Sequence, residues 1–307
     1  MNAHRIAGII LALALLSAVF GCSKSQKQSE AAGDRELNIL CTVLPVYVLA
    51  QNVVEGASGV SLNLLLSPQI GCPHDYALTP TDAAMLEKAD VVVMNGLGLE
   101  TFLQGSPALY RPNLRIIQAS QTVDSITAPH DHAMNSINPH AWVSPFEAAK
   151  MTLYLGLELG RIDTANALRY LSNAQKYAAR LDSLGQILRQ VVMQAPNRRI
   201  VTYHNAFDYF ARDLGLEIIG VVESDPAEEP SARALSDLAH RIQEAKAIGI
   251  FSEPQYSDRL PRMLSSETGV PVYSLDPAAS GDSDAESYLR IMRQNLLTLE
   301  RALIIGH

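Results

Sequence analysis

The stretch "TANALRYLSNAQKYAARLDSLGQILRQVVMQ", residues 164–194, holds no proline and a single glycine. Its apolar side chains recur at steps of three and four residues, the spacing of one face of an α-helix. Asp163 or Thr164 is suited to cap the start, and Pro196 ends the helix. A helix of this length extends for roughly 45 Å. The pattern therefore predicts that this helix is a rigid spine between two parts of the chain. The predicted inward-facing stripe comprises Leu168, Leu171, Ala174, Ala178, Leu181, Leu184, Leu188 and Val191.

Short apolar runs rich in β-branched residues lie on both sides of this spine and alternate with helix-like segments. The predicted strands before it cover 37–43, 61–66, 89–94 and 114–118, and those after it cover 198–203, 216–222, 247–252 and 270–275. Strands that alternate with helices favour parallel sheets built from βα units. The sequence therefore predicts an α/β fold of two lobes. Each lobe is a mostly parallel four-stranded sheet with flanking helices, and one long rigid helix joins the two.

Length and composition fit a globular protein of about two domains. The chain has 307 residues, of which 48% are hydrophobic and 18% charged, unlike a disordered chain. The formal net charge is -8, and Lys and Arg form no cluster longer than a pair. This charge distribution argues against a nucleic-acid partner.

The first residues have the pattern of an export signal. Arg5 precedes an apolar run at 6–20, too short to span a bilayer but suited to the core of a signal peptide. The run ends in Gly21-Cys22, which resembles a bacterial lipobox with Cys22 as the lipidated N-terminus. A plain secretory signal peptide is the alternative. The segment that follows has no apolar anchor, so it is interpreted as a flexible tether.

Three histidines and one aspartate stand near the predicted ends of strands. His74 and His140 each directly follow a proline, in "GCPHDYALTP" and "SINPHAWVSP", and proline stiffens the backbone that leads into each ring. His74 lies in the turn after the second predicted strand, and His140 lies in the loop that leads away from the fourth. His204 follows the strand "RRIVTY", and Asp276 follows the last strand. Ligand sites of open parallel sheets form beyond the carboxyl ends of the strands.

These four side chains, two from each lobe, would complete a four-coordinate shell suited to zinc. Glu100 and Glu253 are candidates to orient the imidazoles, and the alternative for them is a structural hydrogen bond or a surface charge. His130 and His132, in "PHDH", form a small patch that is more typical of a solvated loop. No metal ligand is expected among the remaining histidines.

Two cysteines remain once Cys22 is assigned to the lipid anchor. An exported protein lies in an oxidising environment, in which Cys41 and Cys72 are candidates for a disulfide. Both fall near the carboxyl ends of strands that we expect to be neighbours, so their Cα atoms are expected to lie within bridging distance.

Several motifs together resemble one protein family, the zinc/manganese solute-binding lipoproteins of ABC importers, of the zinc-uptake and surface-adhesin type. They are "GCPHDYALTPTDAAMLEKADVVVMNGLGLE", "NPHAWVSP", "YHNAFDYFARDLGLEIIG", "EEPSARALSDL", "FSEPQYS" and "SLDP", in that order from 71 to 277. The resemblance covers almost the whole chain after residue 37. It implies the two-lobed fold with a long connecting helix, and it implies that the metal ligands are His74, His140, His204 and Asp276.

Two positions depart from the pattern of that family. Cys72 stands two residues before His74, where a small or acidic residue is more usual, and it places a possible extra sulfur near the metal. The His- and acid-rich loop of many zinc-uptake members is reduced here to "PHDHAMNS", which weakens any inference from that loop to zinc.

The resemblance implies a receptor rather than an enzyme. It would be lipid-anchored at the outer face of a membrane, bind a divalent transition metal, most simply zinc, and deliver it as a monomer to a permease driven by a cytoplasmic ATPase. The alternatives are a manganese or iron receptor of the same fold and, from another class, a zinc-dependent hydrolase. The chain contains no HExxH or GxSxG phrase that would favour the hydrolase. The expected organisation is a signal peptide (1–21), a lipid anchor and tether (22–36), an N-terminal metal-binding lobe (37–162), a connecting backbone helix (163–195) and a C-terminal metal-binding lobe (196–307).

Overall fold

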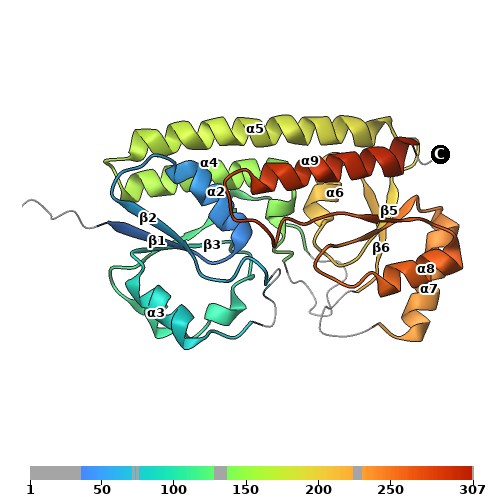
Figure 1. Cartoon of the computed structure of the whole chain (residues 1–307), viewed down its shortest axis with the longest axis horizontal. Helices are drawn as coiled ribbons and strands as arrows, with labels where there is room; N and C mark the ends of the chain where they lie inside the picture. Colours follow the sequence, from blue (N-terminus) through green and yellow to red (C-terminus); the bar gives the residue numbers. More distant parts are fainter. Residues whose placement is uncertain (1–35, 71–72, 74–75, 128–136, 224–229, 306–307) are drawn as a thin grey trace, which may run out of the picture. The chain divides into compact units, whose positions relative to one another are not determined.

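A computed structural model describes residues 36–70, 73, 76–127, 137–223 and 230–305. Two parallel sheets lie side by side under a layer of long helices (Figure 1). The first has the strand order β2-β1-β3-β4, and the second repeats it as β6-β5-β7-β8. The strands are β1 (Leu37–Cys41), β2 (Val60–Leu64), β3 (Val91–Met94), β4 (Arg115–Gln118), β5 (Arg199–Thr202), β6 (Glu217–Val221), β7 (Gly249–Ser252) and β8 (Val272–Ser274).

Every strand pairing in the two sheets is parallel. The predicted two-lobed α/β fold is therefore confirmed, with strands that are slightly shorter than the apolar runs that predicted them. The helices are α2 (Leu44–Val54), α3 (Pro80–Lys88), α4 (Pro145–Ile162), α5 (Ala167–Gln194), α6 (Asp208–Leu214), α7 (Ala232–Ala245), α8 (Arg259–Thr268) and α9 (Ser287–Glu300). Short helical turns are η1 (Thr101–Leu103), η2 (Pro107–Tyr110), η3 (Ala119–Thr122), η4 (Ala141–Val143) and the π-turn η5 (Arg301–Ile305).

Helix α5 is the predicted spine, 28 residues long. It begins at Ala167 rather than at Thr164, because Asp163 is engaged in a turn. The Asp163 carboxylate accepts hydrogen bonds of 2.7 Å from both Asn166 Nδ2 and the hydroxyl of Tyr170. Tyr170 is consequently drawn inward and is fully buried, whereas Leu168 is 85% exposed. The predicted stripe was wrong at Leu168 and Leu171, which are exposed, and correct from Ala174 onward, where the predicted positions are buried.

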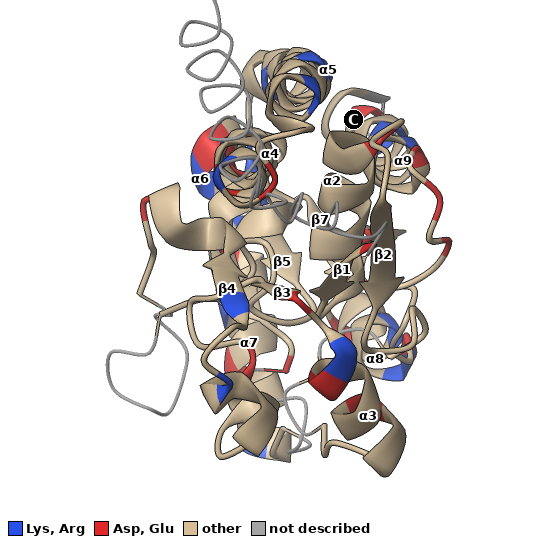
Figure 2. Cartoon of the chain, turned by 90° about the vertical axis from the view of Figure 1, so that its left-hand side faces the viewer, with Lys and Arg blue, Asp and Glu red and all other residues tan. Residues whose placement is uncertain are grey.

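The spine does not stand alone. Helix α4 packs antiparallel beneath it on the side of the first lobe, and α9 lies beside it on the side of the second lobe (Figure 1). Figure 2 views α5 almost end-on, with α4 and α9 on either side below it. One buried apolar cluster continues from Ile39 in the first sheet through Leu181 of α5 to Phe210 of α6. Because this core is continuous, both sheets pack against the same layer of helices.

A small residue controls how closely α4 and α5 approach. A Cβ atom added at Gly156 of α4 would lie 2.6 Å from the Ala174 Cβ and 3.1 Å from the carbonyl oxygen of Tyr170, both on α5. At Gly160, one turn further along, the nearest atoms would be those of Ala167 at 3.4 Å, an ordinary contact. The two glycines therefore make a matched pair for measuring the packing of the spine.

We expect Gly156→Ala to destabilise the protein and Gly160→Ala to leave it unchanged or more stable. Both variants gain roughly 0.5–1 kcal/mol from the better helix propensity of alanine, but only the first carries an overpacking cost of about 1–3 kcal/mol. Urea unfolding midpoints of the two variants check this expectation. An equal shift in both variants would contradict the close approach at Gly156.

Candidate metal site

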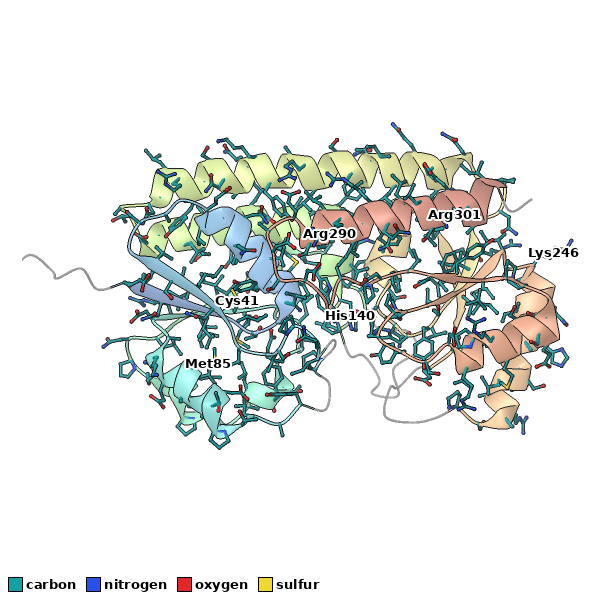
Figure 3. The ribbon with its side chains drawn as sticks, viewed as in Figure 1. Cys41, Met85, His140, Lys246, Arg290 and Arg301 are labelled. Carbon is teal, nitrogen blue, oxygen red and sulfur yellow. The ribbon has the colours of Figure 1, made fainter. Side chains whose placement is uncertain are left out.

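His140 lies in the loop that leaves the first lobe, immediately before η4, and its side chain is close to the junction of the two lobes (Figure 3). The residue is 3% exposed. Its Nδ1 atom lies 2.9 Å from Oδ1 of Asn138, and its ring centroid lies 5.2 Å from that of Trp142. The position and orientation of the imidazole are thus held by two neighbours in its own loop.

His204 follows β5 of the second lobe and is also buried. Its Nδ1 atom lies 2.5 Å from Oε1 of Glu253, which follows the neighbouring strand β7. The other oxygen of Glu253 accepts a hydrogen bond of 2.7 Å from Gln255 Nε2. Of the two roles considered for Glu253, the structure supports the orientation of an imidazole.

Glu100 has the other role. Its buried carboxylate accepts hydrogen bonds from the Thr42 hydroxyl at 2.8 Å and from the backbone N–H groups of Asn95 and Gly96 at 2.6 and 3.0 Å. Burial raises the pKa of Glu100, against the opposing effect of these hydrogen bonds. Glu100 therefore has the structural role, because its hydrogen bonds hold the loop after β3 inside the first lobe.

The two described histidines of the predicted site meet across the lobes. The ring centroids of His140 and His204 are 5.2 Å apart, with the ring planes at 84°. Since protein oxygens engage both Nδ1 atoms, a metal would be bound through the Nε2 atoms. Tyr256 packs edge-on against the other side of the His204 ring, at 5.5 Å between centroids.

Asp276 directly follows Leu275, at the carboxyl end of β8 in the second lobe. The side-chain amide of Asn295, on α9, holds the Asp276 backbone by two hydrogen bonds. The Asn295 Oδ1 accepts from the Asp276 N–H at 2.9 Å, and the Asn295 Nδ2 donates to the Asp276 carbonyl at 2.8 Å. Burial raises the pKa of the Asp276 carboxyl, and the N–H of Ala278 opposes that shift. In addition, Trp142 Nε1 donates to the Pro277 carbonyl at 2.9 Å. The loops of His140 and Asp276 are therefore fastened to each other.

The fourth predicted ligand, His74, lies outside the described residues, as do Cys22, Cys72, His130 and His132. The turn that leads towards His74 approaches the loop after Asp276, because Gly281 N donates to the Pro68 carbonyl at 2.9 Å. Within the described ranges no group of three or more His, Cys, Asp or Glu side chains is placed to hold a metal. The predicted four-ligand shell thus stays a prediction.

Cys41 is fully buried at the end of β1, and burial raises the pKa of its thiol. Its predicted partner Cys72 is outside the described residues, so the disulfide also stays a prediction.

Three residues that support the site were missed by the sequence analysis: Asn138, Trp142 and Asn295. Asn138 and Trp142 stand within the motif "NPHAWVSP" beside His140, which is a usable signal. Asn295 is buried on α9, far along the chain from Asp276, and nothing in the sequence marks it.

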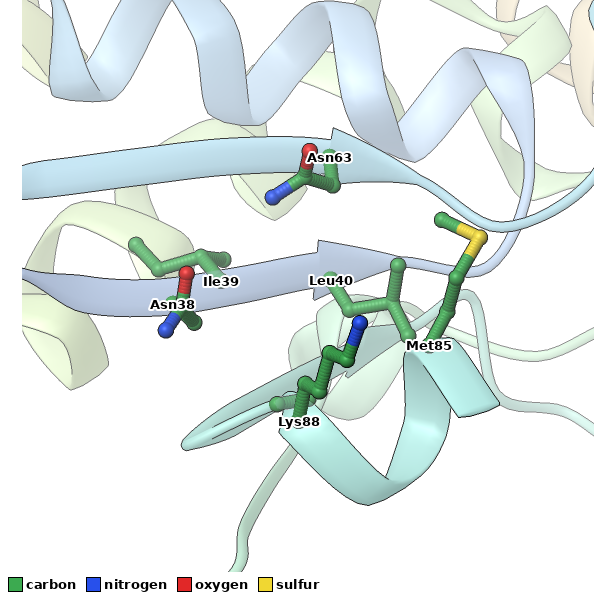
Figure 4. A pocket seen from close by; sticks show the side chains of 7 residues that line it. Asn38, Ile39, Leu40, Asn63, Met85 and Lys88 are labelled. Carbon is green, nitrogen blue, oxygen red and sulfur yellow. The ribbon is translucent and has the colours of Figure 1, made fainter. Parts of the chain in front are cut away.

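A separate hollow on the first lobe does not have the character of a metal site. Its volume is about 150 Å³, and it lies between β1, β2 and the end of α3 (Figure 4). It is lined by Asn38, Ile39, Leu40, Asn63, Met85, Lys88 and Ala89. Its lining contains a lysine and neither imidazole nor carboxylate, so the junction of the lobes is the better candidate for binding a cation.

Comparison with known proteins points to metal uptake. The family described as the periplasmic zinc-uptake complex component A matches residues 39–302. A similar relative is the high-affinity zinc uptake system protein ZnuA of Bacillus subtilis (strain 168), 28% identical, with 97% of each chain covered. The zinc-binding lipoprotein AdcA of Streptococcus pneumoniae (strain ATCC BAA-255 / R6) is 30% identical over 95% of this chain, which spans 60% of that relative's length. A solved structure, the solute-binding protein FpvC of Pseudomonas aeruginosa in complex with Mn²⁺, is 29% identical with a TM-score of 0.76. The match covers 89% of this chain and 100% of that one.

Proposed function

Because this chain belongs to the family of the periplasmic zinc-uptake complex component A, we propose that it is an extracytoplasmic solute-binding lipoprotein of an ABC importer. It captures a divalent transition metal, most simply zinc, between its two lobes and delivers it to a membrane permease that a cytoplasmic ATPase drives. The observation that carries the proposal is the pair of buried imidazoles, His140 and His204, which face each other from different lobes with centroids 5.2 Å apart.

The chemistry of the predicted ligands favours zinc as the transported metal. The predicted ligands His74, His140, His204 and Asp276 would supply three imidazoles and one carboxylate. Nitrogen-rich tetrahedral sites suit zinc, whereas manganese favours harder oxygen ligands. A manganese receptor of the same fold is the second candidate, because the similar protein FpvC has been solved with Mn²⁺.

Zinc is expected to bind with one-to-one stoichiometry and to raise the thermal unfolding temperature. The ligands come from both lobes, so only the folded state assembles them. At a free metal concentration of about 100 times Kd, this preference stabilises the folded state by about 2.7 kcal/mol. Isothermal titration calorimetry and thermal unfolding, with and without zinc, measure both effects. Binding without any thermal shift would contradict a site that only the folded state assembles.

The rival function, zinc-dependent hydrolysis, requires an open coordination position for water and a general base. Four protein ligands would leave no such position. The zinc-loaded protein is therefore expected to hydrolyse generic esters and peptides no faster than zinc in buffer. Turnover that disappears in His204→Ala would favour the hydrolase instead.

The anchor at Cys22 is part of the proposal. Several acyl chains, at about 0.8 kcal/mol for each buried methylene, would hold the mature protein at a membrane. In the part of the chain that the structure describes, no helix has both the length and the hydropathy to cross a bilayer. Intact mass spectrometry of the native protein is expected to show loss of residues 1–21 and a mass increase equal to the acyl chains. A product that begins at another residue and carries no lipid would contradict the anchor.

A further inference from the structure

We propose that Asn138 is a positioning residue that sets the tautomer of His140 and, with the same amide, ties that ligand to the second lobe beside His204. The proposal rests on the proposed function and extends it, because it assigns a role to a residue that is not itself a ligand. Asn138 is 1% exposed, so its hydrogen bonds are shielded from competing water.

The orientation of the Asn138 amide follows from its partners. On one side its amide lies 2.6 Å from the carbonyl oxygen of Asn205 and 2.7 Å from Oδ2 of Asp208. A carbonyl oxygen only accepts and an ionised carboxylate does the same, so this side must be the NH₂ group. The other side lies 2.9 Å from the backbone N–H of His140, which only donates. Oδ1 must therefore face His140.

The orientation of the amide determines which nitrogen of His140 carries the proton. The same Oδ1 lies 2.9 Å from His140 Nδ1. Since a carbonyl-type oxygen has no proton to give, Nδ1 must donate, and the neutral ring keeps its lone pair on Nε2. The ligand is thus in the tautomer that coordinates through Nε2 before a metal arrives.

The same amide joins the two halves of the site. Its NH₂ group donates to the carbonyl of Asn205, the residue next to His204, and to Asp208 at the start of α6. A second contact supports the link, because the Tyr209 hydroxyl of α6 donates to the Asn138 carbonyl at 2.8 Å and accepts from Ile126 N at 3.1 Å. The separation of His140 and His204 is therefore set by protein hydrogen bonds.

Two substitutions separate the two roles. Asn138→Ala removes every side-chain hydrogen bond of the amide. Asn138→Asp keeps an oxygen that accepts from His140 but replaces the NH₂ group with a second oxygen, which faces the acceptors Asn205 O and Asp208. The aspartate variant therefore preserves the tautomer and removes the two hydrogen bonds that the NH₂ group donates to the second lobe, while the bond from Tyr209 to the backbone carbonyl remains.

Asn166 offers a matched control. Its amide likewise accepts from a backbone N–H, that of Ser58, and donates to a backbone carbonyl and to an aspartate, Asp163. It stands at the turn between α4 and α5 and holds no candidate ligand. Asn166→Ala thus reports the general cost of losing such an amide.

The tautomer is read in the metal-free protein by long-range ¹H–¹⁵N correlation of the histidine rings. We expect the protonated Nδ1 of His140 in wild type, in Asn138→Asp and in Asn166→Ala, and its loss in Asn138→Ala. If the alanine variant does not fold, Asn138→Ser, whose shorter hydroxyl does not reach the ring, takes its place. Persistence of the Nδ1 proton in the alanine variant, or in the serine variant that replaces it, would overturn the tautomer role.

The link is read by zinc affinity, measured by chelator competition. Loss of a partner that orients a metal-bound histidine costs roughly 10–100-fold in affinity, which is the range expected for Asn138→Ala. Asn138→Asp is expected to lose about tenfold, and Asn166→Ala less than about threefold. Wild-type affinity in Asn138→Asp would overturn the link. If wild type itself bound no metal, the proposed function would fail, and the tautomer would still be decided by the metal-free spectra.

Discussion

His140→Ala and His204→Ala are each expected to weaken zinc binding by more than the roughly 10–100-fold that loss of a partner to a metal ligand costs. Each substitution removes one donor nitrogen from a buried site. A replacement water would have to enter between His140, His204 and their packed neighbours, including Trp142. His74→Ala is expected to behave in the same way if the four-ligand prediction is correct.

Control variants make this result specific. His240 lies exposed on α7 of the second lobe, so His240→Ala is expected to bind zinc as wild type does. The double variant His130→Ala/His132→Ala is expected to change the affinity little, because these residues are interpreted as part of a solvated loop. Calorimetry with chelator competition measures wild type and all five variants. Loss of all tight binding in the double variant, with binding retained in His204→Ala, would place the site elsewhere.

His204→Glu is expected to narrow the preference for zinc over manganese. Neutral imidazoles and a single carboxylate leave the predicted wild-type site with a formal charge of −1, and imidazole nitrogen is softer than carboxylate oxygen. A second carboxylate supplies harder oxygen, which suits manganese better. The expected change in relative affinity is about tenfold, or ~1.4 kcal/mol.

The structure shows that His204→Glu needs a second, compensating substitution. His204 Nδ1 lies 2.5 Å from Oε1 of the buried Glu253, so a glutamate at position 204 would bring two carboxylates together. Like charges at such a separation disfavour each other's ionised form. Glu253→Gln keeps the shape of the side chain and removes its charge. The double variant His204→Glu/Glu253→Gln is therefore the sharper test of metal preference.

Competition titrations with zinc and manganese on wild type, on Glu253→Gln and on the double variant give the result. We expect a strong zinc preference in wild type, which Glu253→Gln alone keeps and the double variant narrows. A wild type that binds manganese as tightly as zinc would contradict the preference and leave the metal-receptor function standing.

The sequence was sufficient to predict which segments form strands and helices and how they follow one another along the chain. Parallel strands buried on both faces are short apolar runs, such as "VVVM" at β3, and this local property is visible without any partner. The carboxyl-edge rule then placed His204 and Asp276 at the same edge of the second sheet. The end of α5 before Pro196 was likewise predicted from the local sequence, because apolar spacing continues up to that proline.

Contacts between distant residues were decided only by the tertiary structure. Apolar spacing could not show that Tyr170 rather than Leu168 turns inward, because that choice depends on a hydrogen bond to Asp163. Periodicity likewise marked α5 as a spine but did not identify α4 as its partner. A repeat of apolar residues tells which face of a helix is buried and does not tell which surface covers it.

The residues that support the site were likewise identified only by the tertiary structure. Asn138 donates to Asn205 and Asp208, 67 and 70 residues away, and Glu253 reaches His204 over 49 residues. The sequence by itself determined which residue types stand at the ends of the strands, because strand ends follow from local hydrophobic pattern. Only the docking of the two lobes on the helical layer decided which of those side chains meet, because a hydrogen bond depends on positions in space that chain spacing does not encode.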